Sequence, residues 1–94
     1  MLYNYATGRC LDSNAAGSVY TTSASSCGYN DLYQRWNLYG NSSLYSPYMF
    51  WDEGTGRCLD SNTAGNVYAT VNTACGFNNQ YQNWNTTVGP LVTS

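Results

Sequence analysis

The chain has 94 residues, a formal net charge of −2 and only 9% charged residues, with three Arg and neither Lys nor His. So little positive charge argues against nucleic acid as a partner, because phosphates require a basic surface, and against anionic membranes. No apolar run approaches the roughly 18 residues that would insert into a bilayer. The length fits one small domain with a modest core, a size at which disulfides often add stability.

The elements predicted along the chain are short strands separated by turns. The opening letters MLYNYATG predict a strand and a turn rather than a secretion signal. Residues 9–12 and 18–22 form predicted strands on either side of a Gly-ended turn. Residues 23–31 predict a loop, and residues 33–39 predict a third strand. Because no window shows an apolar period of 3.6 residues, we expect an all-β fold.

The same pattern occurs a second time, forty-eight residues further along the chain. Residues 7–37 and 55–85 align without a gap, and twenty of the thirty-one aligned positions are identical. The shared letters are T-G-R-C-L-D-S-N-x-A-G-x-V-Y-x-T, followed by C-G-[YF]-N-x-x-Y-Q-x-W-N. A repeat of this period indicates an internal duplication, in which one structural unit and its site were copied.

Four cysteines, Cys10, Cys27, Cys58 and Cys75, occur without His and without a C-x-x-C pair, so neither a metal site nor another cofactor is expected. Their even number in a short chain favours two disulfides, and hence an extracellular, secreted protein. Three pairings are formally possible. The repeat favours Cys10 with Cys27 and Cys58 with Cys75, because both pairs are then seventeen residues apart.

These motifs together carry a resemblance to a known family. The ordered set C-L-D-S-N, G-x-V-Y and Y-Q-x-W, present twice, resembles the ricin-type (Q-x-W) repeat of β-trefoil lectins, and among them the actinohivin-like, mannose-binding lectins. The resemblance covers about two-thirds of the chain. It implies β-trefoil-like units and a carbohydrate-binding protein whose partners are glycans.

The predicted organisation is a first lectin repeat in residues 1–40, an aromatic linker in residues 41–51 and a second lectin repeat in residues 52–94, together one compact domain. A β-trefoil requires three such units, whereas this chain has two. Oligomerisation or exchange of units between chains could complete the trefoil, since swapping an identical element is a low-cost route to assembly. We therefore expect a homo-oligomer.

Asp12 and Asp60 directly follow the C-L pair of each unit. A carboxylate accepts strong hydrogen bonds from sugar hydroxyls, and the resemblance implies that the Asp at this position is the central sugar ligand. The alternative is that each Asp caps its own turn. Tyr20 and Tyr68 follow eight residues later, and the matching Tyr of the resembled lectins lines their pocket. A Tyr ring suits a half-wet sugar platform, although each could instead pack on the outside of the barrel.

Further sugar contacts are expected from Tyr33 and Tyr81, which directly precede the Gln of each Q-x-W motif. The amides of Asn30 and Asn78, three residues beyond a cysteine in each unit, are candidates for the same role. The resembled lectins have an Asn in this region, but the longer loop of this chain leaves its alignment open.

A second group of residues is expected to be structural. The resemblance assigns the Trp of each motif to the core and its Gln to backbone contacts: Gln34, Trp36, Gln82 and Trp84. The linker contains Tyr45, Tyr48, Phe50 and Trp51. These four either bury against the rest of the fold or form an apolar patch that binds another copy.

The function expected from the resemblance is that of a lectin with two repeated sites for mannose-type or galactose-type glycans. Catalysis is not expected, because without His a Ser or Cys nucleophile lacks its usual base. Asp12 and Asp60 also belong to separate units, whereas glycoside hydrolysis requires two facing carboxylates. The alternative is a structural, self-assembling extracellular subunit with no sugar-binding role.

Overall fold

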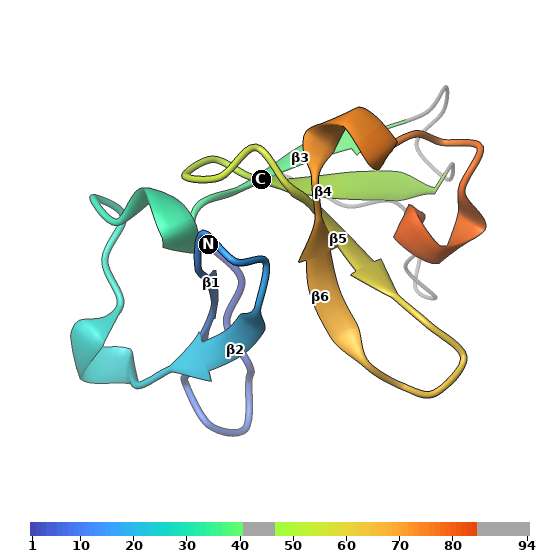
Figure 1. The fold of residues 1–94 in the computed structure, drawn as a ribbon. Helices are drawn as coiled ribbons and strands as arrows, with labels where there is room; N and C mark the ends of the chain where they lie inside the picture. The colour runs from blue at the N-terminus through green and yellow to red at the C-terminus, as the bar shows by residue number, and fades with distance from the viewer. Residues whose placement is uncertain (41–46, 85–94) are drawn as a thin grey trace.

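The computed structural model describes residues 1–40 and 47–84, and within these ranges the regular elements are short antiparallel strands and single 3₁₀ turns. The first part contains a two-stranded sheet and two turns: β1 (Cys10–Ser13), β2 (Val19–Thr22), η1 (Ala24–Ser26) and η2 (Leu32–Gln34). A four-stranded sheet follows in the order β3-β4-β5-β6: β3 (Trp36–Gly40), β4 (Tyr48–Asp52), β5 (Cys58–Ser61) and β6 (Val67–Thr70), with the turns η3 (Asn72–Ala74) and η4 (Gln80–Gln82) after it. The all-β prediction is confirmed (Figure 1).

The two hairpins β1–β2 and β5–β6 are copies of one another, as the duplication predicts. Asp12 lies opposite Tyr20 in the first hairpin, and Asp60 lies opposite Tyr68 in the second. Each connecting turn is closed by an Asn whose Oδ1 accepts two backbone N–H groups. Each turn also ends in a glycine with φ +90°, a conformation that only glycine adopts without strain. The S-N-x-A-G motif is therefore a turn requirement.

The third predicted strand begins later than the sequence indicates. Residues 32–34 form the 3₁₀ turn η2, and the strand starts at Trp36. The reason is local, because Oδ1 of Asp31 accepts the backbone N–H of Tyr33 and caps the turn. Asn79 caps η4 in the same way through the N–H of Tyr81.

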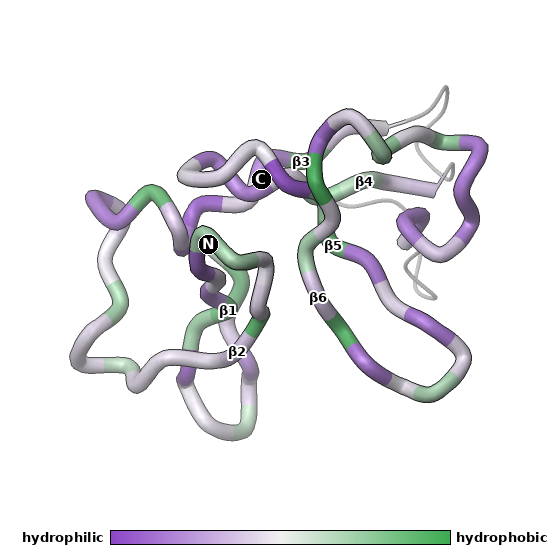
Figure 2. The backbone as a smooth tube through the Cα atoms, viewed as in Figure 1, coloured by the Kyte–Doolittle hydropathy of each residue, from purple (hydrophilic) through white to green (hydrophobic). Residues whose placement is uncertain are grey.

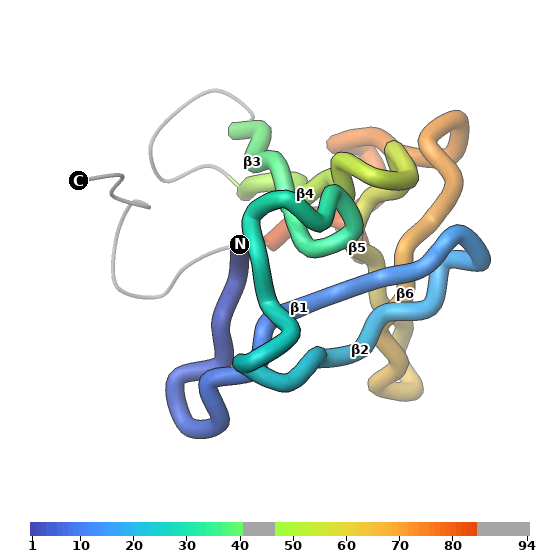
Figure 3. Tube along the Cα trace, turned by 90° about the vertical axis from the view of Figure 1, so that its left-hand side faces the viewer, coloured from blue at the N-terminus to red at the C-terminus, as the bar shows by residue number. Residues whose placement is uncertain are grey.

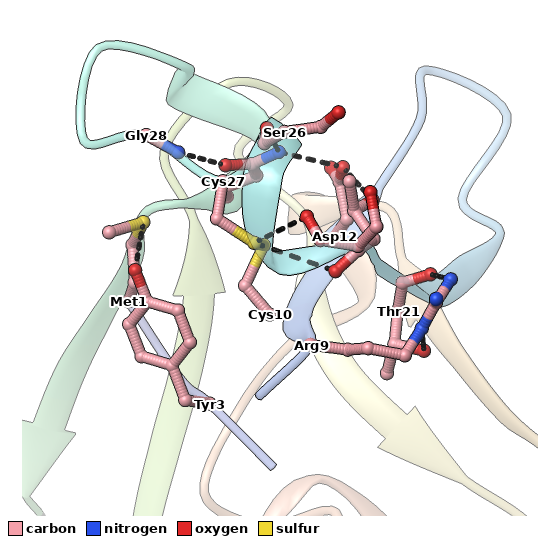
Figure 4. The surroundings of a disulfide bond; sticks show 12 residues. Met1, Tyr3, Arg9, Cys10, Asp12, Thr21, Ser26, Cys27 and Gly28 are labelled. Carbon is pink, nitrogen blue, oxygen red and sulfur yellow. Dashed lines mark hydrogen bonds between the residues drawn. A yellow bond between two sulfur atoms is a disulfide. The ribbon is translucent and has the colours of Figure 1, made fainter. Parts of the chain in front are cut away.

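One disulfide links each hairpin to the loop that follows it. Cys10 is bonded to Cys27 (Figure 4) and Cys58 to Cys75, so the predicted pairing is confirmed. No described cysteine is free. Disulfides of this kind persist in oxidising compartments, in agreement with an extracellular setting.

The buried core is small and as polar as it is apolar. Its apolar members are Cys10, Tyr48, Met49, Cys58, Leu59 and Ala69, and its polar members are Asp12, Ser13, Gln34, Asp52, Asp60 and Gln82. Figure 2 colours the backbone by residue hydropathy, and its hydrophobic stretches are short. Hydrogen bonds must therefore specify much of this interior, because buried polar groups are costly when unpaired.

Residues 48–51, which are part of the predicted aromatic linker of residues 41–51, belong to β4 of the second sheet. β4 pairs with β3 over five residue pairs, and Tyr48 and Met49 are buried. Trp51 packs edge-on against Tyr39, with the ring centroids 6.1 Å apart. Tyr45 and residues 85–94 lie outside the described residues.

The two units also contact each other directly (Figure 3). The backbone N–H of Ala69 on β6 donates to the carbonyl of Gly17 in the β1–β2 turn at 2.8 Å. The Ser13 hydroxyl donates to Oδ2 of Asp52 at 2.7 Å. An ion pair joins Arg35 to Glu53. These bonds hold the β1–β2 hairpin of the first unit against β4 and β6 of the second unit.

Candidate functional site

The candidate site of the first unit is built around the carboxylate of Asp12. Its Oδ2 accepts the hydroxyl of Thr22 at 2.6 Å and Nε2 of Gln34 at 3.1 Å. Its Oδ1 accepts the backbone N–H of Ser13 at 2.8 Å. Asp12 is only 6% exposed. Because a carboxylate has about four lone-pair positions, about one remains for a further donor.

The second unit reproduces this arrangement around Asp60. Thr70 donates at 2.6 Å, Gln82 at 3.1 Å and the N–H of Ser61 at 2.7 Å, and Asp60 is 5% exposed. Each carboxylate therefore joins the two strands of its hairpin and the 3₁₀ turn that carries the Gln. The turn-capping alternative describes the Ser N–H bond, but it accounts for only one of the three bonds.

Each Gln of the Q-x-W motifs donates a hydrogen bond to its Asp and also binds the loop that precedes the Gln in the chain. Gln34 donates to the carbonyl of Ser26 at 3.2 Å and accepts the N–H of Gly28 at 2.9 Å. Gln82 makes the matching bonds to Ala74 and Gly76. Both Gln side chains are buried. The loop beyond each cysteine is fixed relative to the carboxylate in this way, as Figure 4 shows around Asp12.

Trp36 and Trp84 are partly buried, and each indole N–H donates to a backbone carbonyl. The acceptors are Leu11 at 3.1 Å and Leu59 at 3.2 Å, directly before the two Asp residues. Each Trp is thus anchored to the strand that carries the carboxylate, and its N–H is not available to a ligand.

Tyr20 and Tyr68 lie beside these carboxylates. In each hairpin the Tyr faces the Asp across the strand pair, and its hydroxyl donates to the carbonyl of Ser13 or Ser61 at 3.1 or 3.2 Å. Tyr20 is 44% exposed, whereas Tyr68 is half-buried. The hydroxyl bond fixes each ring and leaves ring surface open to solvent.

The two Tyr sites differ in electrostatics. Partial burial, followed by repulsion from the carboxylate of Asp12, raises the pKa of the Tyr20 hydroxyl. Asp31 and Asp52 add contributions of the same sign. In the second unit the position of Asp31 is taken by the uncharged Asn79.

The other predicted site residues are exposed. Tyr33 and Tyr81 are exposed on η2 and η4, and among the described residues no hydrogen bond joins either side chain to an Asp. Tyr33 lines a hollow of about 240 Å³ between the units, together with Arg57 and Asn72. The structure thus brings Asp and the hairpin Tyr together, and places Tyr33 beside a separate hollow.

Asn30 and Asn78 are exposed, and no described residue bonds to their amides, so both are available to a ligand.

Sequence reasoning missed Thr22 and Thr70, which make the shortest bonds to the two carboxylates. The signal was present, because Thr is the last letter of the shared G-x-V-Y-x-T. It also missed Asp31 and Asn79, the residues that cap the turns. That function was readable from the Asx-capping preference, although the two residues are not identical.

Within the described residues no group of three His, Cys, Asp or Glu side chains could hold a metal ion. None of the helices in those residues is long and apolar enough to cross a membrane.

No protein-family model matches the chain, and no curated protein matches it in sequence.

Proposed function

We propose that the chain is a carbohydrate-binding protein with two equivalent sites, one in each unit, of the ricin-type (Q-x-W) lectin kind. One observation carries this proposal: each unit places a Tyr ring opposite a buried Asp, held by the same hydrogen bonds at both copies. Positions nearby differ freely, as at Ser23 and Val71. Two units that vary around a constant polar cluster fit a retained binding site.

The chemistry of each cluster suits a neutral polyol. The Tyr ring offers a flat apolar face to sugar C–H groups, and its hydroxyl orients the ring by bonding the backbone. The Asp accepts from the protein with three of about four lone-pair positions, which leaves about one acceptor for a sugar hydroxyl. The free amides of Asn30 and Asn78 add donors and acceptors at the rim. The Asp is then mainly a positioning residue, with at most one direct sugar contact.

The proposed ligands are mannose-type or galactose-type glycans outside the cell. Secretion is proposed because two disulfides favour an oxidising compartment. Two sites on one small chain suit branched glycans, since each shallow site alone would bind with a Kd of roughly 1 mM. The proposal assigns the chain no catalytic activity.

A glycan array tests the proposal with the wild-type chain and a Tyr20→Ala/Tyr68→Ala variant. We expect the variant to lose at least tenfold in binding, because the platform is removed while the buried Asp cluster remains. Tyr3→Ala is the matched control: Tyr3 is an exposed Tyr whose hydroxyl contacts only Met1 Sδ among the described residues. Urea unfolding of each variant confirms that the fold is kept.

Asp12→Ala/Asp60→Ala is less informative alone, because three internal bonds per unit are lost with each carboxylate. Equal binding by wild type and the Tyr double variant would refute the proposed sites. Absence of binding by the wild-type chain to every glycan would instead favour the structural, self-assembling subunit.

A further inference from the structure

The contact between the two units uses one surface from each, and the duplication places a second copy of both surfaces elsewhere on the chain. In the contact, residues 13–18 and 32–35 of the first unit meet residues 52–54 and 68–69 of the second. The positions forty-eight residues away are 61–66 and 80–83 in the second unit, and 4–6 and 20–21 in the first. We call residues 61–66 and 80–83 the trailing surface, and residues 4–6 and 20–21 the leading surface.

Hydrogen-bonding groups that the internal contact satisfies are open on these two surfaces. The N–H of Glu53 donates to the carbonyl of Arg35 at 2.8 Å. The counterparts are the N–H of Tyr5 and the carbonyl of Asn83, and neither has a hydrogen-bond partner among the described residues. A pairing of the leading surface with a trailing surface would join them.

Burial shows the same asymmetry between equivalent positions. Asp52 is fully buried, whereas its counterpart Asn4 is exposed. Gly17 is buried, and a Cβ added there would lie 2.6 Å from the carbonyl oxygen of Ala69. At Gly65 a Cβ would meet no described atom within 4 Å. In Figure 1 the β5–β6 turn that carries Gly65 projects away from the rest of the molecule.

The side chains on the two surfaces are also complementary. Ser13 donates its hydroxyl to Oδ2 of Asp52, and Asn4 in the place of Asp52 presents an Nδ2 group that can donate to the hydroxyl of Ser61. Tyr5, in the place of Glu53, is fully exposed.

We propose that the chain associates head to tail, the leading surface of one copy binding the trailing surface of another in the geometry of the internal contact. The occupant is a second copy, because only the same repeat carries the matching half. Such a contact is heterologous, so the copies form a ring if the rotation between units closes and an open array if it does not.

One position weakens the copied contact relative to the internal one. Gly54 packs against the turn of residues 32–33, where a Cβ would lie 2.9 Å from Cδ1 of Tyr33. Its counterpart on the leading surface is Ala6, whose Cβ must therefore displace Tyr81 or the surrounding backbone. The association is accordingly weaker than the internal contact, and Ala6 controls its strength.

Sedimentation equilibrium over a range of concentrations tests this proposal with four proteins: the wild-type chain, Ala6→Gly, Ala6→Glu and Ala74→Glu. We expect the wild-type mass to rise above 10.4 kDa with concentration. Ala6→Gly relieves the over-packed contact and should tighten association by about fivefold to a hundredfold. Ala6→Glu should abolish association. Ala74→Glu makes the same change at an exposed position on η3, outside both surfaces, and should leave it unchanged.

Two results would overturn the proposal. One is a mass of 10.4 kDa for both the wild type and Ala6→Gly at every concentration. The other is an oligomer that Ala6→Glu leaves intact, because assembly would then use a different surface. All four proteins are expected to fold, since both positions are exposed, and circular dichroism verifies this. The readout is mass and does not involve glycans, so its failure is separate from failure of the proposed function.

Discussion

At the scale of single residues, Asn4 and Asp52 show how the same structural position tolerates two side chains. Oδ1 of each accepts two backbone N–H groups of its own turn, from Ala6 and Thr7 in the first unit and from Gly54 and Thr55 in the second. Asp52 differs in being fully buried and in accepting the hydroxyl of Ser13. The negative charge is therefore dispensable for the turn and costly for the buried position.

This difference predicts a pH dependence of stability that one substitution removes. Burial raises the pKa of the Asp52 carboxyl above its ordinary value of 3.8, and the hydrogen bonds that it accepts offset this only in part. Because the folded chain then binds the proton more readily than the unfolded chain, the free energy of unfolding falls as pH rises from about 3.8 through the raised pKa. We expect Asp52→Asn to flatten this decline and to be at least as stable as wild type at pH 7.

Urea unfolding at a series of pH values from about 3.8 to neutral measures the effect. Asp31→Asn is the matched control, because Asp31 is exposed and Asn79 performs the same capping in the second unit. If the free energy of unfolding of Asp52→Asn falls with pH as steeply as that of wild type, the Asp52 carboxyl is not the group responsible for the decline.

At the scale of elements, the two hairpin turns have the same sequence pattern and different surroundings. Gly17 and Gly65 both have φ +90°, so Ala at either position costs about 1–2 kcal/mol in backbone strain. Only Gly17 packs against β6, where the added Cβ would clash with the carbonyl of Ala69. We expect Gly17→Ala to cost about 1–3 kcal/mol more than Gly65→Ala in monomeric chain.

Urea midpoints of the two variants, taken at low concentration, give that difference directly. The backbone strain is common to both turns and cancels. Equal losses would mean that the turn of the first unit does not pack on β6 in solution.

The disulfides are predicted to supply a large share of the stability of these elements. Each bridge closes a separation of seventeen residues, which in the chain-entropy view stabilises by about 3 kcal/mol. Because small domains have only about 5–15 kcal/mol in total, reduction of both bridges should unfold the chain or lower its urea midpoint severely. Replacing Cys10 and Cys27 by Ser should cause about half of that loss. Identical unfolding curves with and without reductant would contradict this.

Because the unit is duplicated, several features of the secondary-structure elements could be predicted from the sequence. It predicted the all-β class, the two hairpins and the pairing of Cys10 with Cys27, because a repeated motif must satisfy the same geometry twice. It did not predict η2, since Tyr33 and Gln34 alternate like a strand while the cap at Asp31 decides the conformation. The burial of Asp12 was also not predictable, because its partners Thr22 and Gln34 are brought together only by the fold.

At the scale of the whole molecule, two copies of a unit share a core that is half polar. The apolar part is small, and many aromatic side chains stay exposed, among them Tyr3, Tyr29, Tyr39 and Tyr81. The apolar core therefore supplies few hydrophobic contacts. The exposed aromatic rings are available to contact ligands or other copies of the chain. If both proposals hold, the two copies of the unit supply the stability, the assembly surfaces and the binding sites of the chain.

Binding at this scale depends on whether the two proposed sites act on one ligand. A single site with a Kd of roughly 1 mM gains about 10²–10⁴ in avidity when both sites hold one branched glycan. Tyr68→Ala leaves only the site at Tyr20. We expect this variant to bind a monosaccharide at half the stoichiometry with an unchanged Kd, and to lose most of the additional affinity for a branched oligosaccharide.

Isothermal titration with the two ligands separates these effects, and Tyr3→Ala again serves as the control on an exposed Tyr outside the sites. A branched glycan that binds Tyr68→Ala as tightly as wild type would mean that the sites are too far apart, or wrongly oriented, for one glycan to span. Multivalency would then have to arise from association of copies, because joining chains is the other way to place several sites near one ligand. Ala6→Glu, which is predicted to block association, would in that case lower avidity while leaving monosaccharide binding unchanged.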